Sequence, residues 1–264
     1  ELKLSIGDTI KVYKANMIIP QIAQNLTRSG VKDIPKVCPV CGGKTEIRQV
    51  SNAKALYCTN PECQAKHVKA FALFASRDAL NIEGLSEATL EKFIDRGFIK
   101  EFTDIFHLDK WQEEIQTMEG FGEKSYKNLI ANVEKAKVTT LPKVIYALGI
   151  PGIGLANAKV ICREFSGDVD RMIHATAEEL AEIQGVGEVL AGAFVTYFQD
   201  EKHVESLKRL IAELEIPKEE ESESQQIFAG VNFVITGSVE HFANRGEVKE
   251  LIESLGGKVT GSVT

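Results

Sequence analysis

Hydrophobic residues recur at helical spacing through most of residues 67–216, and this region is therefore expected to be α-helical. The N-terminal residues follow a different pattern. Residues 9–14 alternate between apolar and polar side chains, and residues 4–8 and 17–20 are short segments of the same character. This pattern predicts short β-strands before the helical region begins, as in part of a small β-barrel.

The C-terminal residues combine strand and helix patterns. An apolar run over 231–236, a helical pattern over 244–255 and a further strand pattern from Lys258 predict the beginning of a β-α-β unit. Residues 217–227 are mostly polar and acidic, so they are expected to form a linker. The fold class expected from these patterns is multidomain and mainly α, with small β elements at both ends.

One short pattern occurs four times in the helical region: an apolar residue, any residue, Gly, an apolar residue, and then Gly or Ser. The first glycines of the four copies are Gly84, Gly120, Gly152 and Gly185, which lie 36, 32 and 33 residues apart. An apolar residue follows each first glycine after nine positions, namely Phe93, Leu129, Ile161 and Phe194. Because helical periodicity lies on both sides of each copy, the pattern predicts four helix-hairpin-helix motifs.

The glycines give these motifs a physical role in binding phosphate. Glycine permits a positive φ and a tight turn, so backbone N–H groups at the start of the second helix are left unpaired. A DNA phosphate is a natural partner for such donors, and this contact reads no base. Some copies could instead only pack against their neighbours. The residues expected to contact DNA are Gly84, Gly120, Gly122, Lys124, Gly152, Gly154, Gly185 and Gly187.

The charge of the surrounding residues distinguishes the four copies by their expected affinity for DNA. The net charge of −7 argues against DNA binding through bulk electrostatics. Residues 124–163, however, hold seven basic residues and only one acidic residue, Glu134. This basic segment overlaps copies two and three, whereas copies one and four are flanked by glutamates. Copies two and three are therefore expected to dominate DNA affinity.

Four of the five cysteines form two close pairs separated by sixteen residues. Two short loops that each deliver two thiolates suit tetrahedral Zn²⁺, and four sulfur ligands leave no open position, so the metal is expected to be structural. Disulfides or unrelated buried thiols are the alternatives. His67 could compete as a ligand, and Cys162, within an apolar helical pattern, is expected to be an inert buried thiol. The expected zinc ligands are Cys38, Cys41, Cys58 and Cys63.

The order of these modules resembles the C-terminal part of bacterial NAD-dependent DNA ligase. The strings that carry the resemblance are residues 13–21, 38–42, 146–150 and 228–230 leading to 236–238. The chain has Asn16-Met17 where members of that family often have Gly-Asp. The resemblance divides the chain into an OB-fold remnant (1–35), a zinc finger (36–66), four helix-hairpin-helix motifs (67–216), a linker (217–227) and the start of a BRCT domain (228–264).

The resemblance implies a three-step reaction. A lysine is adenylated by NAD, AMP passes to the 5′-phosphate of a nick, and the 3′-hydroxyl displaces it. The family's Lys-x-Asp-Gly motif is absent from this sequence, so no catalytic residue is expected here. NAD and Mg²⁺ would be used by the parent enzyme outside this chain, which should be inactive alone.

The expected part of this chain is to grip nicked double-stranded DNA, independently of sequence, during replication and repair, with the zinc finger as a rigid brace. A monomer in the bacterial cytoplasm, associated with the nucleoid and not with a membrane, is expected. One alternative is a non-catalytic repair scaffold that binds DNA through the hairpins and partners through the BRCT-like unit. Another is a nuclease or topoisomerase fragment, although no carboxylates cluster at metal-ligand spacing.

Overall fold

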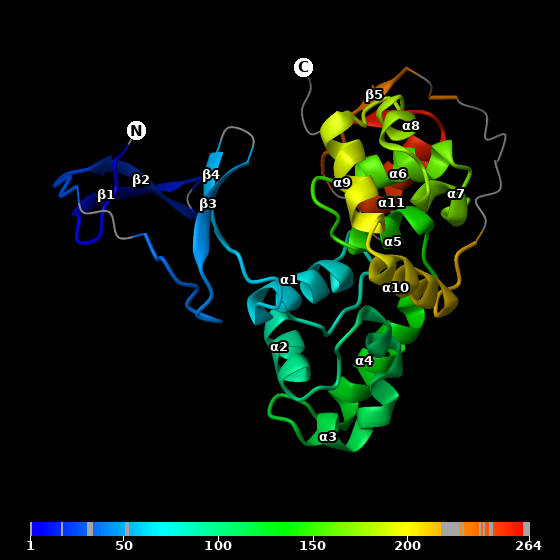
Figure 1. The fold of residues 1–264 in the computed structure, drawn as a ribbon, viewed down its shortest axis with the longest axis horizontal. Helices are drawn as coiled ribbons and strands as arrows, with labels where there is room; N and C mark the ends of the chain where they lie inside the picture. Colours follow the sequence, from blue (N-terminus) through cyan, green and yellow to red (C-terminus); the bar gives the residue numbers. More distant parts are fainter. Residues whose placement is uncertain are drawn as a thin grey trace. The chain divides into compact units, whose positions relative to one another are not determined.

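The computed structural model describes residues 2–16, 18–30, 34–50, 53–217, 227–228, 230–237, 239, 241–242 and 245–260 (Figure 1). The chain divides into two compact units. The first comprises residues 1–133 and 147–149, and the second comprises residues 134–146 and 150–264. None of the described helices has both the length and the apolar composition needed to cross a membrane.

The first unit begins with an antiparallel hairpin of two strands. Strand β1 (Ile10–Ala15) pairs with β2 (Ile19–Asn25), and the register shifts between Lys11 and Val12. Residues 4–8, expected as a strand, instead include a turn at residues 6 and 7, and the Asp8 carboxylate accepts a hydrogen bond from the Ser5 N–H at 2.9 Å. With two paired strands in its sheet, this segment does not confirm the expected barrel remnant.

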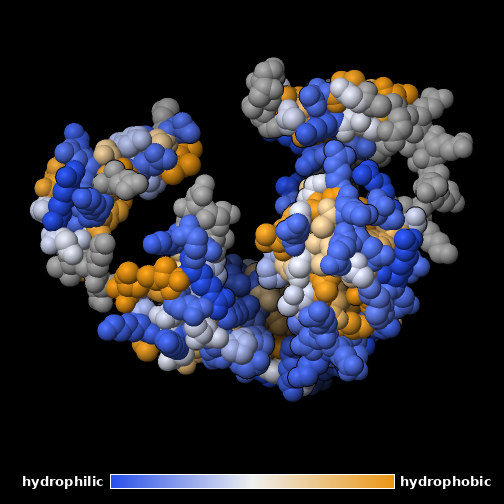
Figure 2. Space-filling model, turned by 45° about the horizontal axis from the view of Figure 1, so that its top comes forward, coloured by the Kyte–Doolittle hydropathy of each residue, from blue (hydrophilic) through white to orange (hydrophobic). Residues whose placement is uncertain are grey.

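Much of the apolar surface of this hairpin is exposed. Figure 2 shows hydrophobic residues at the surface of the strand-bearing part of the chain, at the left of both views. The large hydrophobic side chains exposed on β1 and β2 are Ile10, Val12, Tyr13 and Ile19. Met17, which follows Asn16 in the sequence, lies outside the described residues.

A second antiparallel hairpin leads into the first helix. Strand β3 (Thr45–Val50) pairs with β4 (Ala53–Cys58), and α1 (Gln64–Ala75) begins directly after Cys63. The boundary expected after residue 66 therefore falls inside α1, so the cysteine-bearing loops pass into the helical region without a linker.

The remaining helices of the first unit enclose an aromatic and aliphatic core. They are α2 (Glu87–Asp95), the 3₁₀ helix η1 (Phe102–Trp111), α3 (Gln112–Thr117) and α4 (Glu123–Ala136), whose last residues belong to the second unit. Phe74 is fully buried and its ring stacks on Phe102 with centroids 4.5 Å apart. Ile105, Leu108 and Ile115 complete this core.

The second unit contains six consecutive short helices. They are α5 (Leu141–Ala147), α6 (Leu155–Glu164), α7 (Val169–Ile173), α8 (Ala177–Ala181), α9 (Glu188–Phe198) and α10 (Glu201–Ala212). Their core includes Ile161, Met172 and Phe194, each with at most 1% of its surface exposed. The helical content expected for residues 67–216 is confirmed.

The C-terminal segment forms the expected β-α-β unit with short strands. Strand β5 (Asn232–Phe233) lies parallel to β6 (Lys258–Val259), and α11 (Arg245–Ser254) connects them. The strand expected over 231–236 pairs only at residues 232 and 233. Most of the expected linker, residues 218–226, lies outside the described residues, as do residues 243 and 244.

Candidate nucleic-acid interface and metal centre

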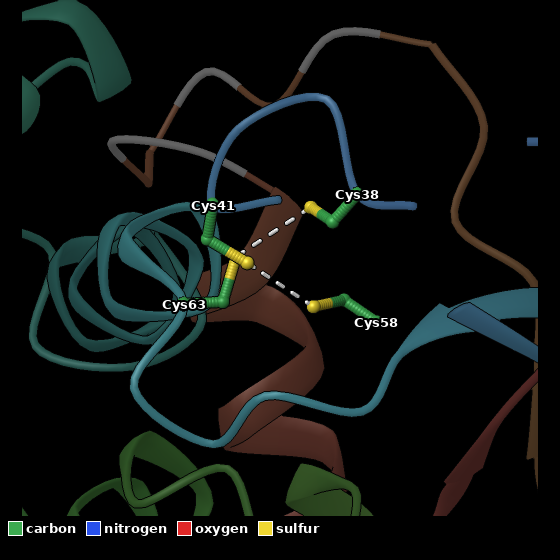
Figure 3. A group of neighbouring side chains, drawn as sticks. All are labelled: Cys38, Cys41, Cys58 and Cys63. Carbon is green, nitrogen blue, oxygen red and sulfur yellow. Dashed lines mark hydrogen bonds between the residues drawn. The ribbon is translucent and has the colours of Figure 1, made fainter. Parts of the chain in front are cut away.

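The four paired cysteines converge on one point, as Figure 3 shows. Their sulfur atoms all lie within 4.8 Å of one another, with Cys38 3.9 Å from Cys63 and Cys41 3.5 Å from Cys58. Tetrahedral zinc with Zn–S bonds of about 2.3 Å holds its sulfurs about 3.8 Å apart. These cysteines are free rather than disulfide-bonded, and their spacing fits a metal of this kind.

The first pair of cysteines is held by a tight knuckle. The Cys38 N–H donates to the carbonyl oxygen of Gly43 at 2.7 Å, and the Gly42 N–H donates to that of Cys38 at 2.9 Å. Gly42 has a φ of 68°. A Cβ on Gly43 would lie 3.2 Å from the Cys41 sulfur and 3.0 Å from Asn60 Cβ, so the knuckle closes only around a residue without a side chain.

The surroundings of the cysteine thiols shift their pKa values in different directions. The backbone N–H of Gly43 donates to the Cys41 sulfur at 3.4 Å, and this bond, with one from Asn60, lowers the pKa of Cys41 to about 6. Backbone N–H groups of Cys41 and Val40 lower the pKa of Cys38. Burial raises the pKa of Cys58 to about 11. A bound cation would therefore be needed to hold Cys58 as a thiolate near neutral pH.

The fourth ligand candidate begins a helix. Cys63 is the N-cap of α1, where the helix dipole favours a negative charge. His67, one turn later, stands 3.7 Å from a carboxylate oxygen of Glu62 and lies outside the sulfur cluster. Cys162 is buried, with its sulfur 4.0 Å from that of Met172, as expected for an inert thiol.

Each glycine pattern lies between two helices, as predicted. The four hairpins are α1 with α2, α3 with α4, α5 with α6, and α8 with α9, and they are called hairpins 1 to 4 below. Hairpin 1 has the longest connection, with residues 76–86 between its helices. Hairpins 1 and 2 belong to the first unit and hairpins 3 and 4 to the second, except that residues 134–136 of α4 belong to the second unit and residues 147–149 of hairpin 3 to the first.

The first glycine of each hairpin makes the turn. Its φ is 98° at Gly84, 87° at Gly120, 80° at Gly152 and 92° at Gly185, a region that side-chain-bearing residues rarely adopt. The apolar residue after it packs inward, and the apolar residue nine positions after it is buried in all four hairpins. The inward-facing residues are Leu85, Ile153 and Val186, which are buried, and Phe121, which is half-buried against Phe93.

The second glycines behave differently from what the sequence predicted. Gly154 has φ −82° and ψ 171°, and Gly187 has φ −83° and ψ 171°, values that any residue can adopt. Gly122 likewise has no positive φ. A Cβ built on any of the three would meet no atom within 4 Å. Positive φ therefore explains only the first glycine of each pattern, whereas the second leaves open space where a side chain would stand.

The hairpins differ in how their helix-initiating N–H groups are used. In hairpin 1, the Ser86 hydroxyl accepts the Thr89 N–H at 3.2 Å. In hairpin 2, the Gly122 N–H donates to the Ser125 hydroxyl at 2.8 Å. Hairpins 3 and 4 begin their second helices at Gly154 and Gly187, and no side chain caps either helix. In hairpin 4, however, the Leu190 N–H already donates to the carbonyl oxygen of Gly187 at 2.9 Å. The hydrogen bonds of the described residues thus leave more donors for a ligand at hairpin 3 than at the other three hairpins.

Part of the basic segment is already paired within the chain. Lys127 contacts Glu123 at 2.6 Å, and Lys159 contacts Glu253 at 3.2 Å. Lys124, in the first turn of α4, is exposed beside Gly122. Of the four hairpins, hairpin 3 combines basic surroundings with a second helix that no side chain caps. Which hairpins dominate DNA affinity stays a prediction. The sequence analysis did not predict the serine hydroxyls that occupy donors at hairpins 1 and 2, although a serine directly before a helix, such as Ser86, is a known N-cap signal.

Comparison with known proteins gives two family matches. Residues 143–207 match the helix-hairpin-helix motif family, and residues 223–264 match the BRCA1 C Terminus (BRCT) domain family. The first match covers hairpins 3 and 4, the pair with uncapped second helices.

Several curated proteins that are similar to this chain are named DNA ligase. The chain is 59% identical to one from Lachnoclostridium phytofermentans and 55% identical to one from Ruminiclostridium cellulolyticum, in each case over all of this chain and 40% of the relative. It is 39% identical to one from Thermosipho africanus with the same coverage. The chain thus spans about 40% of the length of these curated relatives.

Proposed function

We propose that this chain is the DNA-gripping region of an NAD-dependent enzyme that seals single-strand nicks. The matches confirm its resemblance to the C-terminal part of a bacterial DNA ligase. Its hairpins would hold the phosphate backbone near the nick, independently of base sequence. The parent enzyme would use NAD and Mg²⁺ outside this chain and act in the bacterial cytoplasm, in replication and repair.

One observation carries this proposal. Gly122, Gly154 and Gly187 have neither a positive φ nor a neighbour within 4 Å of a built Cβ, so nothing in their own surroundings requires glycine. A missing side chain at the start of a helix lets a phosphate oxygen approach the backbone N–H groups closely. The same residue type at the same place in three hairpins indicates a shared external partner with regularly repeated anionic groups.

The four-cysteine cluster supports a structural role for a metal. We propose zinc bound by Cys38, Cys41, Cys58 and Cys63, because the sulfur spacing suits its tetrahedral geometry. Cys63 joins the cluster directly to α1, the first helix of hairpin 1. Metal binding would therefore fix the start of the hairpin region and contribute to DNA affinity without taking part in nick chemistry.

Titration of the zinc-loaded chain with nicked duplexes tests this function. Binding should be equal for two unrelated sequences, weaken with salt, and weaken further in Gly154→Val. Gly192→Val is the matched control, because Gly192 also has no positive φ and no neighbour within 4 Å of a built Cβ but lies within α9. A clear sequence preference, or equal loss in both variants, would contradict backbone binding at the turn.

A second measurement separates a ligase from a repair scaffold. The chain is mixed with the adenylation portion of a relative such as that of Lachnoclostridium phytofermentans, NAD, Mg²⁺ and a nicked duplex. A ligase region should raise sealing above that of the adenylation portion alone, and it should form no adenylated protein by itself. Unchanged sealing alongside intact DNA binding would favour the scaffold.

A further inference from the structure

Hairpins 1 and 2 hold each other through polar contacts that run in both directions. Lys92, on the second helix of hairpin 1, donates from Nζ to the carbonyl oxygen of Glu119 at 3.1 Å. Asn132, on the second helix of hairpin 2, donates from Nδ2 to the carbonyl oxygen of Glu83 at 3.1 Å. Each donor therefore reaches the residue directly before the first glycine of the opposite turn.

Apolar packing supports the same pairing. A Cβ built on Gly84 would lie 3.4 Å from Cδ1 of Leu129, so the turn of hairpin 1 rests directly on α4 of hairpin 2. In the other direction, the Phe121 ring in the turn of hairpin 2 lies 5.7 Å from the ring of Phe93 on α2. Each turn is thus held by one hydrophobic contact and one hydrogen bond from the opposite hairpin.

The two hydrogen bonds also change the electrostatics of the turns. A backbone carbonyl oxygen beside the N–H donors carries a partial negative charge that would repel a phosphate. Lys92 and Asn132 occupy these oxygens at Glu119 and Glu83, and Lys92 adds a positive charge beside the second turn. Hairpin 3 is arranged differently, since Asn157 donates to the carbonyl oxygen of Gly152 within the same hairpin at 3.3 Å.

We propose that Lys92 and Asn132 are positioning residues that hold the turns of hairpins 1 and 2 in one fixed arrangement, so that both turns meet the DNA backbone together. They act through the Glu119 and Glu83 carbonyls rather than by touching DNA. This inference rests on the proposed DNA binding. Because phosphates along a strand are regularly spaced, two turns locked at one separation bind with less loss of freedom than two independent ones.

The test uses the zinc-loaded chain, a fluorescent nicked duplex and a set of matched variants. Lys92→Met and Asn132→Leu remove the donors while keeping similar side-chain volume, and Asn132→Asp keeps the shape but cannot donate. Lys92→Arg keeps a donor and the charge. Lys110→Met is the control, because it removes an equal charge from an exposed position on η1. Circular dichroism measures the folded fraction of every variant.

Each donor-removing variant should weaken DNA binding by about threefold to tenfold, the range expected when one hydrogen bond is lost. Lys92→Arg and Lys110→Met should stay within about twofold of the parent chain. Because either loss already frees the turns, Lys92→Met with Asn132→Leu should bind no more than about twofold more weakly than the weaker single variant.

Losses that multiply in the double variant, loss in Lys110→Met equal to that in Lys92→Met, or unchanged binding in both Asn132 variants would each overturn the positioning role. Lys92→Arg failing to restore binding would also overturn it. In all these outcomes the parent chain still binds DNA. Failure of the parent chain to bind would instead overturn the proposed function and this inference together.

Discussion

A Cβ built on Gly152 would lie 2.6 Å from Cδ2 of Leu190, so the turn of hairpin 3 packs directly against the second helix of hairpin 4. Gly185 has a similar positive φ but no neighbour within 4 Å of a built Cβ. The two glycines therefore separate two reasons for excluding a side chain, namely backbone conformation and close packing.

This difference predicts unequal costs for alanine at the two positions. Gly185→Ala should lower the free energy of unfolding by about 1 kcal/mol through its positive φ alone. Gly152→Ala should cost about 0.5–1.5 kcal/mol more, because Leu190 must leave its preferred rotamer. Urea unfolding measures both. In a Leu190→Ala background the two costs should become equal, and a persistent difference would contradict the contact.

Replacing Gly154 with serine should raise stability and lower DNA affinity. Serine is a favoured N-cap, and Ser86 shows the arrangement in hairpin 1, where its hydroxyl accepts the Thr89 N–H. Gly154→Ser should add only a few tenths of a kcal/mol to the free energy of unfolding, because glycine is itself a tolerated N-cap, while the serine hydroxyl occupies an N–H donor that would otherwise bind phosphate. Thermal unfolding and DNA titration measure the two effects. Tighter DNA binding in Gly154→Ser would contradict a phosphate contact at this helix.

Lys124 should contribute a charge contact to the DNA backbone. It is exposed in the first turn of α4, directly after the Gly122 turn. If it neutralises one phosphate, Lys124→Gln should reduce the slope of log affinity against log salt by about 0.9. Lys110→Gln, which removes an exposed lysine from η1, should leave the slope unchanged. Equal slopes in the two variants would place Lys124 away from DNA.

Zinc affinity should depend on pH with a break near the pKa of Cys41. At pH 7.5 Cys41, whose pKa is lowered to about 6, is mostly thiolate, whereas Cys58, whose pKa is raised to about 11, must lose a proton to bind metal. Below about pH 6 Cys41 must also lose a proton, so the affinity should fall more steeply with each further pH unit.

Chelator competition between pH 5 and 8 measures this break. Asn60→Ala removes one hydrogen bond that lowers the pKa of Cys41, so it should shift the break to higher pH. The expected stoichiometry is one zinc per chain, and Cys58→Ser with Cys63→Ser should abolish binding. A constant pH slope in the parent chain would contradict the unequal thiol environments.

Local features account for most of what sequence analysis predicted correctly. The four turns follow from glycines that permit a positive φ within a few residues, and the cysteine cluster follows from two short loops. The predicted strand over residues 4–8 was wrong because Asp8 makes side-chain bonds to residues distant in sequence, including Asn25 at 2.7 Å and the Ser29 N–H at 2.7 Å. Such bonds leave no periodic signal.

The order of the modules, the four glycine turns and the four thiols could be predicted without a structure, because each depends on residues that are close along the chain. The occupied N–H groups, the glycines that face a neighbour and the pairing of the hairpins became visible only in the folded chain. Those properties depend on contacts such as Asn132 with Glu83, which are 49 residues apart, and Lys92 with Glu119, which are 27 apart. Hydrophobic periodicity fixes which face of a helix is buried, but the partner of each exposed polar group is set by packing between helices.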